Sequence, residues 1–169
     1  MIVVAITGAS GVIYGIRLLE ALKELNIENS LVISDAAKIV IESETDYETD
    51  DIIKLADTYY DFNDLTASIN SGSFKADALA IVPCSMKTLS SIANGYGANT
   101  ITRVADVSLK ERRPVVIVPR ETPLRSVPIH SRPAREPPTA TAVHPVQQSD
   151  YAKKWRILHQ NRHRADEKQ

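Results

Sequence analysis

The stretch that decides the fold is IVVAITGASG, at residues 2–11. Ile2–Ile6 is a continuous apolar run rich in β-branched residues, which is typical of a strand covered on both faces of a parallel sheet. The glycine-rich Gly8–Gly11 then opens a helical pattern, so the stretch predicts a buried strand, a tight turn and a helix N-terminus. Backbone amides at such a turn bind phosphate groups, and a plain strand-to-helix turn is the alternative interpretation.

The rest of residues 1–124 repeats the alternation of strands and helices with short connections. Right-handed crossovers between parallel strands place helices on both faces of the sheet. The pattern therefore predicts a doubly wound α/β fold (Rossmann-like, flavodoxin-like) with a parallel sheet in a three-layer α/β/α arrangement. The further strands are expected at Leu31–Ile33, Ala78–Val82 and Pro114–Val118, and the helices at about 13–25, 35–43, 49–56, from 87 onward and 100–111.

Length and composition fit one ordinary globular domain, with 169 residues, 43% of them hydrophobic and 24% charged. No apolar run reaches the length that crosses a bilayer. The single cysteine, Cys84, excludes an internal disulfide, and we expect a cytoplasmic protein.

A boundary falls at Leu124, where the composition changes abruptly. Residues 125–169 contain nine Lys/Arg against four Asp/Glu, a net charge of +5, together with all four histidines and five of the nine prolines. They show neither helical nor strand periodicity. We interpret residues 1–124 as the functional domain and residues 125–169 as a divergent tail, either frameshifted or disordered.

Small hydroxyl residues, glycines and cations follow the predicted strands. Ser34 follows the second strand, Pro-Cys-Ser-Met-Lys-Thr the third at 83–88, and Pro-Arg-Glu-Thr-Pro the fourth at 119–123. Because parallel strands end at one edge of the sheet, these segments predict an anion site there. The alternatives are that Ser85 is a helix cap beside a solvated Lys87, and that the arginine and glutamate form a surface ion pair.

Together, and in this order, these motifs resemble the UbiX-type flavin prenyltransferases, within a wider group of flavin-binding, decarboxylase-like proteins. The resemblance covers essentially all of residues 1–124. The matching segments are 7–17, 32–34, 44–46, 71–74, 83–88, 103–113 and 119–124.

The resemblance implies an enzyme that joins a dimethylallyl group from dimethylallyl monophosphate to N5 and C6 of reduced FMN. The product, prenylated FMN, is the cofactor of a partner UbiD-type decarboxylase. The family needs no metal and assembles into trimers and dodecamers, so we expect a homo-oligomer.

The resemblance also implies the site. The FMN-binding residues would be Gly8, Ala9, Ser10, Ser34, Ser85, Met86, Lys87, Thr88 and Arg120. Arg103, Lys110 and Arg120 would surround the prenyl phosphate, and Glu44 and Glu121 would line the reacting centre. Cations stabilise a departing phosphate, and a carboxylate can take the proton that the flavin ring loses.

The chain departs from the family after Leu124. The family continues with an amphipathic helix, a strand, a Pro-Pro-x-Pro-Ala-Phe-Tyr motif and a final helix with a basic residue, none of which is recognisable here. Tyr151 lacks the surrounding motif and receives no role.

Two other functions stay open. The first is an FMN-dependent decarboxylase of the same fold, which the Glu44 and Arg120 motifs and the absence of histidine before residue 125 disfavour. The second is a non-catalytic FMN-binding remnant or basic-tailed adaptor. Nucleic-acid binding is not expected, because the basic tail lacks interleaved aromatics beyond Tyr151 and Trp155.

Overall fold

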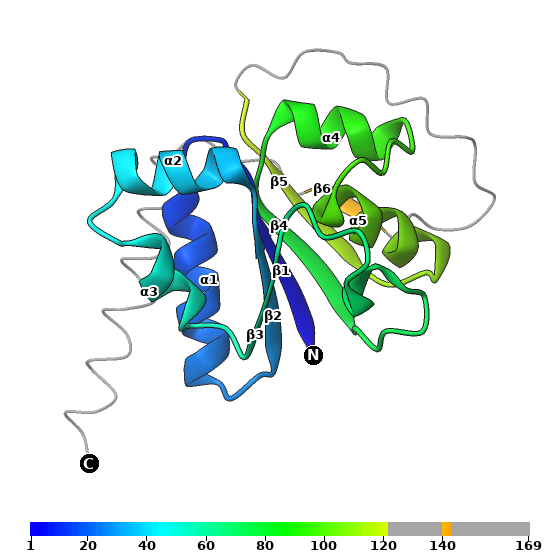
Figure 1. Ribbon diagram of the computed structural model, residues 1–169, viewed down its shortest axis with the longest axis horizontal. Coiled ribbons are helices and arrows are strands. Elements are labelled where there is room, and N and C mark those ends of the chain that lie inside the picture. The colour runs from blue at the N-terminus through cyan, green and yellow to red at the C-terminus, as the bar shows by residue number, and fades with distance from the viewer. Residues whose placement is uncertain (122–139, 143–169) are drawn as a thin grey trace, which may run out of the picture.

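The computed structural model describes residues 1–121 and 140–142. They form a six-stranded sheet in the order β3-β2-β1-β4-β5-β6, and every strand pair is parallel. The predicted fold class is therefore confirmed (Figure 1). The strands are β1 (Ile2–Ile6), β2 (Asn29–Ile33), β3 (Thr58–Tyr60), β4 (Ala78–Cys84), β5 (Val115–Pro119) and β6 (Ala140–Ala142).

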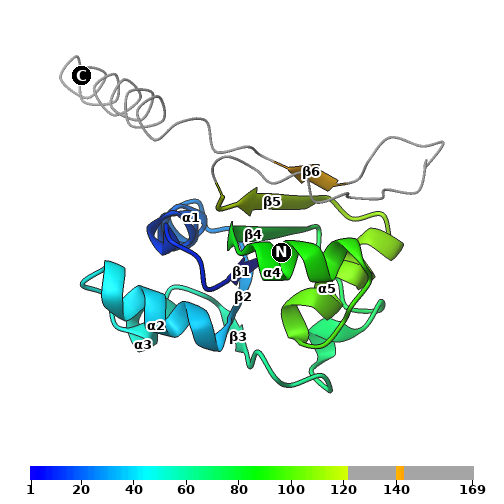
Figure 2. The same cartoon turned by 90° about the horizontal axis from the view of Figure 1, so that it is seen from above.

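Helices cover both faces of the sheet, as Figure 2 shows. On one face α1, α2 and α3 pack on alternate residues of β1 and β2, such as Val4 and Ile6. On the other face Val3 and Ala5 join the core beneath α5. None of the helices in the described residues is long and apolar enough to cross a membrane. The helices are α1 (Val12–Glu24), α2 (Asp35–Glu44), α3 (Thr49–Ile53), α4 (Met86–Ala93) and α5 (Thr100–Lys110), with a short 3-10 helix at Ser68–Asn70.

The strand order reverses between β1 and β4. The chain winds from β1 outward through β2 and β3, and then returns to β4 on the other side of β1. In doubly wound sheets, ligands bind outside the carboxyl ends of the strands at this switch point. Here the switch point lies between the turn after Ile6 and the start of α4.

Thr7 joins the two strand ends at the switch point. Its buried hydroxyl donates to the carbonyl of Pro83 at 2.8 Å and accepts from the backbone amide of Ser85 at 2.7 Å. Its own amide donates to the same Pro83 carbonyl at 3.2 Å. One side chain thus fixes where β1 ends relative to the first residue before α4.

Two glycines allow close packing around this edge. A Cβ on Gly15 would lie 2.3 Å from the carbonyl oxygen of Val82, so its absence lets α1 contact β4 directly. A Cβ on Gly8 would lie 2.4 Å from the Cβ of Ala36, so the turn after β1 packs against the first turn of α2. Both positions need glycine because of space alone.

The structure corrects the predicted elements in four places. It adds β3 and β6, extends β4 through Pro83 and Cys84, and ends α3 at Ile53. Thr58–Tyr60 lacks a long apolar run because β3 is an edge strand of the sheet. Ala140–Ala142 pairs with β5 through backbone hydrogen bonds, which an alternation of side chains does not reveal. The rest of the predicted tail, residues 125–139 and 143–169, lies outside the described residues.

Replacing Thr7 with Val should destabilise the protein. Valine keeps the shape but leaves the amide of Ser85 and the carbonyl of Pro83 without this partner, at a cost of about 1–3 kcal/mol. The measurement is the midpoint of urea unfolding, with Thr7→Ser as the control that retains the hydroxyl. Equal midpoints for the Val and Ser variants would contradict the role assigned to the hydroxyl.

Candidate functional site

The carboxyl ends of four strands are linked into one rim by hydrogen bonds. The amide of Ser34, after β2, donates to the carbonyl of Ile6 in β1 at 3.0 Å. Thr7 then links β1 to β4, and the amide of Arg120, after β5, donates to the carbonyl of Cys84 at 3.1 Å. The predicted anion-binding segments are thus brought together at one edge of the sheet.

Two serines on this rim cap helices. The Oγ of Ser34 accepts from the amide of Ala37 at 3.2 Å and starts α2. The Oγ of Ser85 accepts from the amide of Thr88 at 3.3 Å, donates to its hydroxyl at 3.0 Å, and starts α4. Both helices present their positive N-terminal ends at the rim, which favours an anionic ligand.

The capping role of Ser85, one of the two interpretations of its sequence, is therefore present in the structure. Met86 is half-buried in the first turn of α4, and the side chain of Lys87 is exposed. A cap and a ligand contact are compatible, because a serine oxygen has two lone pairs and a rotatable proton.

The turn after β1 contains the next predicted group. Gly8 and Ala9 are half-buried and Ser10 is exposed. Gly11 has a φ of 92° at the N-cap of α1, a left-handed conformation that favours glycine.

Two predicted site residues, Glu44 and Arg120, lie near Gly11. Its amide donates to Oε2 of Glu44, the last residue of α2, at 2.8 Å. The guanidinium Nε of Arg120 lies 3.9 Å from the place where a Cβ on Gly11 would stand. A carboxylate and a cation from distant segments therefore meet at the start of α1.

Glu121 directly follows Arg120 at the carboxyl end of β5. Its Oε2 is buried and has no hydrogen-bond partner among the described residues. A buried carboxylate oxygen without a donor is costly, typically by about 1–3 kcal/mol or more for a charged group. The position directly after Arg120 fits a site that receives a donor, or a proton, from a bound molecule.

Arg103 and Lys110 lie at opposite ends of α5. Arg103 is exposed, one turn into the helix, and pairs with Asp106 at 3.3 Å. Lys110 ends the helix and precedes the amino end of β5, whereas Arg120 follows the carboxyl end. The strand between them spans about 16 Å, at about 3.3 Å per residue. The structure does not bring Lys110 to the rim of its own chain.

Cys84 is buried at the end of β4. Burial raises the pKa of its thiol to about 12, and this outweighs the opposing hydrogen bond from the backbone of Leu89. A thiol in this state is a weak nucleophile. Cys84 is therefore a small buried residue at the end of β4.

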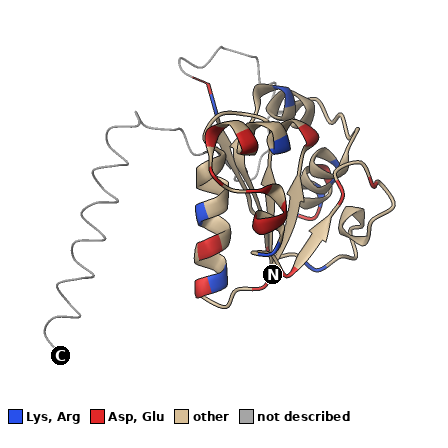
Figure 3. Cartoon of the chain, turned by 60° about the vertical axis from the view of Figure 1, so that its left-hand side comes forward, with Lys and Arg blue, Asp and Glu red and all other residues tan. Residues whose placement is uncertain are grey.

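Acidic residues gather on α2, α3 and the connection between them, as Figure 3 shows. Glu42, Asp46, Glu48, Asp50 and Asp51 are all exposed, as expected for a solvated face. No group of three or more His, Cys, Asp or Glu side chains within residues 1–121 and 140–142 is arranged to hold a metal ion.

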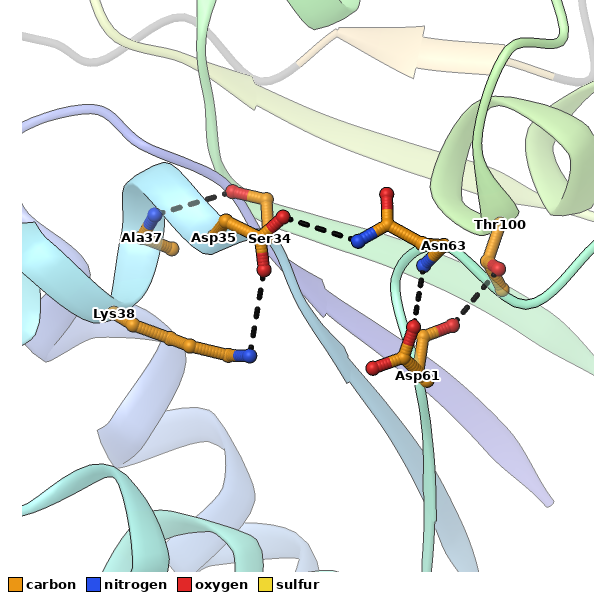
Figure 4. Close-up of polar contacts among 7 residues, drawn as sticks. All are labelled: Ser34, Asp35, Ala37, Lys38, Asp61, Asn63 and Thr100. Carbon is orange, nitrogen blue, oxygen red and sulfur yellow. Dashed lines mark hydrogen bonds and ion pairs between the residues drawn. The ribbon is translucent and has the colours of Figure 1, made fainter.

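Sequence analysis missed two features of the rim. The first is Thr7, to which the sequence prediction gives no role, although a hydroxyl directly after five apolar strand residues is a usable signal. The second feature is a hydrogen-bond network from Asp35 through Asn63 to Asp61 and Thr100 (Figure 4). Nothing in the sequence indicated this network, because its members lie far apart in the chain.

Comparisons with known proteins agree with this geometry. The model of the Flavoprotein family matches residues 1–135. The chain is 56% identical over 127 residues to the flavin prenyltransferase UbiX of Methanothermobacter thermautotrophicus, which is 75% of this chain and 66% of the relative. It is 56% identical over 126 residues to that of Methanocaldococcus jannaschii, or 75% of this chain and 68% of the relative. The chain therefore spans about two thirds of the length of these relatives.

Two solved structures are similar as well. A crystal structure of AnUbiX in complex with FMN and dimethylallyl pyrophosphate matches with a TM-score of 0.78 and 48% identity, over 86% of this chain and 77% of that one. The dodecameric FMN-dependent UbiX-like decarboxylase from Escherichia coli O157:H7 matches with a TM-score of 0.73 and 48% identity, over 74% and 68%. The chain belongs to the Flavoprotein family and, within it, to the UbiX-type flavin prenyltransferases.

Proposed function

We propose that the chain is a flavin prenyltransferase. It would transfer a dimethylallyl group from dimethylallyl monophosphate to N5 and C6 of reduced FMN, giving prenylated FMN for a UbiD-type decarboxylase. The observation that carries the proposal is the buried carboxylate oxygen of Glu121, directly after Arg120, which has no hydrogen-bond partner among residues 1–121 and 140–142. The identity to UbiX relatives and the two ligands bound in AnUbiX support it.

The rim would hold the flavin. Reduced FMN supplies the two ring atoms that receive the dimethylallyl group. The N-terminal ends of α2 and α4 suit its phosphate, since amides and the helix dipole both favour an anion there. The proposed FMN-binding residues remain Gly8, Ala9, Ser10, Ser34, Ser85, Met86, Lys87, Thr88 and Arg120.

Arg120 and Glu121 would perform the two chemical tasks. The guanidinium of Arg120 stabilises the phosphate as its bond to the allylic carbon breaks. Oε2 of Glu121 accepts the proton that the ring carbon releases when the second bond forms. Glu44 would line the reacting centre from its place at Gly11, where its carboxylate accepts the backbone amide.

A homo-oligomer would complete the prenyl-phosphate site. Lys110 and Arg120 lie beyond opposite ends of β5 in one chain, so we propose that a neighbouring copy supplies Lys110 to the phosphate. Arg103 is exposed and available on the same helix. The dodecameric relative from E. coli supports assembly, and the choice between a trimer and a dodecamer stays a prediction. A cytoplasmic location also stays a prediction.

The first test is anaerobic incubation of the protein with reduced FMN and dimethylallyl monophosphate, followed by mass spectrometry of the released flavin. We expect a flavin heavier by one five-carbon unit. A parallel reaction with dimethylallyl pyrophosphate compares the proposed donor with the ligand found in AnUbiX. Flavin that co-purifies but stays unmodified with both donors would favour a non-catalytic remnant, and carbon dioxide released from an added carboxylic acid would favour a decarboxylase.

Replacing Glu121 with Gln should slow product formation far more than it weakens FMN binding. The amide keeps the size and polarity of the side chain but cannot accept the ring proton, and general-base catalysis typically contributes about 10²–10⁴-fold in rate. Turnover at saturating substrates and the FMN dissociation constant are the two measurements.

Glu42→Gln is the matched control, because it makes the same change on the exposed outer surface of α2. It should leave both quantities unchanged. Unchanged turnover in Glu121→Gln, at equal flavin affinity, would remove Glu121 from the chemistry.

Cys84 should take no covalent part in the reaction. Burial raises the pKa of its thiol to about 12, so the thiol is almost entirely protonated at pH 8. We expect iodoacetamide to leave the folded protein unmodified at pH 8 and to add one group in urea, as read by intact mass. Rapid alkylation of the folded chain would show an accessible, activated thiol instead.

A further inference from the structure

The connection after β3, residues 61–67, packs against the core beneath α5 through Phe62 and Ala67. On one side it is held by Thr100, the first residue of α5, which is fully buried. The hydroxyl of Thr100 donates to the carbonyls of Asp61 at 2.9 Å and Asp64 at 3.1 Å, and its amide donates to that of Phe62 at 3.0 Å. This end of the connection is therefore anchored firmly.

On the other side the attachment is a single side chain. Nδ2 of Asn63 donates to Oδ2 of Asp35 at 3.1 Å (Figure 4). Among the described residues, this is the one side-chain hydrogen bond that joins residues 61–67 to α2. Asp35 directly follows Ser34, the cap of α2 on the rim. The bond therefore spans from the α5 side of the sheet to the start of α2.

Asn63 donates two hydrogen bonds to two different carboxylates, one from its side chain and one from its backbone. Its side chain donates to Asp35, while its backbone amide donates to Oδ1 of Asp61 at 2.7 Å. Lys38 adds one cation, 3.4 Å from the other oxygen of Asp35. A neutral donor satisfies this arrangement, whereas a third carboxylate at position 63 would be repelled by both neighbours.

We propose that Asn63 and Asp35 form an edge clasp that holds residues 61–67 against α2 and retains the flavin beside Ser34. The clasp is a pair of positioning residues: it sets how fast the flavin leaves and does not take part in the chemistry. The inference rests on the proposed function, since it assigns the ligand at Ser34 as FMN. An exposed hydrogen bond contributes little net free energy, so this bond can open and close.

The test is a charge change followed by a swap. Asn63→Asp replaces the donor with a repelled carboxylate, and the double variant Asn63→Asp with Asp35→Asn restores a donor and an acceptor in exchanged places. Asn26→Asp is the matched control, because Asn26 is exposed at the opposite edge of the sheet and follows α1 in a left-handed conformation.

FMN dissociation rates of the full chain are measured by flavin fluorescence. We expect Asn63→Asp to raise the rate roughly two- to fivefold, the scale of an exposed charged pair. The swap should return it to the wild-type rate and the control should not change it. The increase should shrink in 1 M salt, because salt screens repulsion between exposed carboxylates.

The outcomes separate the clasp from the proposed function. If wild-type protein binds FMN and Asn63→Asp releases it at the same rate, the clasp is overturned while the flavin site stands. A faster release that the swap does not reverse also overturns it, since general destabilisation would give that result. If wild-type protein does not bind FMN at all, the proposed function fails first.

Discussion

The hydroxyl of Thr7 is the contact on which the rim depends. It donates to one strand-end carbonyl and accepts from the next free amide, so it fixes β1 against β4 where the sheet order reverses. From this point, single backbone bonds extend the rim to Ser34 on one side and Arg120 on the other. Loss of the hydroxyl would leave the amide of Ser85 without this acceptor and the carbonyl of Pro83 with only the backbone amide of Thr7, at the edge where the candidate site is built.

Helix N-termini and Arg120 give the rim a positive electrostatic potential. Two serine-capped helices begin on it, and Arg120 lies close to the start of a third helix at Gly11. The carboxylate of Glu44 accepts the hydrogen bond from the amide of Gly11, and its negative charge offsets part of this positive potential. An anionic ligand at the rim would therefore lie close to helix N-termini, one guanidinium and two carboxylates. Together these groups would discriminate between ligands of different charge.

The two neighbouring residues after β5, Arg120 and Glu121, differ in how their polar groups are satisfied. Arg120 is held by its backbone to Cys84, and Glu121 keeps one oxygen buried without a partner in the described part of the chain. Such a group is tolerated where a ligand supplies the missing donor. Lys110 instead precedes the amino end of β5, at the opposite edge of the sheet from Arg120.

The sequence by itself determined the α/β class and the edge that carries the site. Apolar strands such as Ile2–Ile6 and the polar segments that follow them are local patterns, and local patterns are visible in a sequence. The same holds for the serine caps, since Ser34 and Ser85 stand directly before helical runs. The motifs of residues 7–17 and 119–124 were specific enough to indicate the family.

Tertiary structure alone decided which distant residues meet. The contact of Glu44 with Gly11 and the bond of Asn63 with Asp35 depend on how crossovers fold back on the sheet. The strand at Ala140–Ala142 could not be predicted from the sequence for a related reason. Its pairing with β5 is made by backbone groups that every residue carries. Periodicity reports which face of an element is buried, and it carries no information about the partner across space.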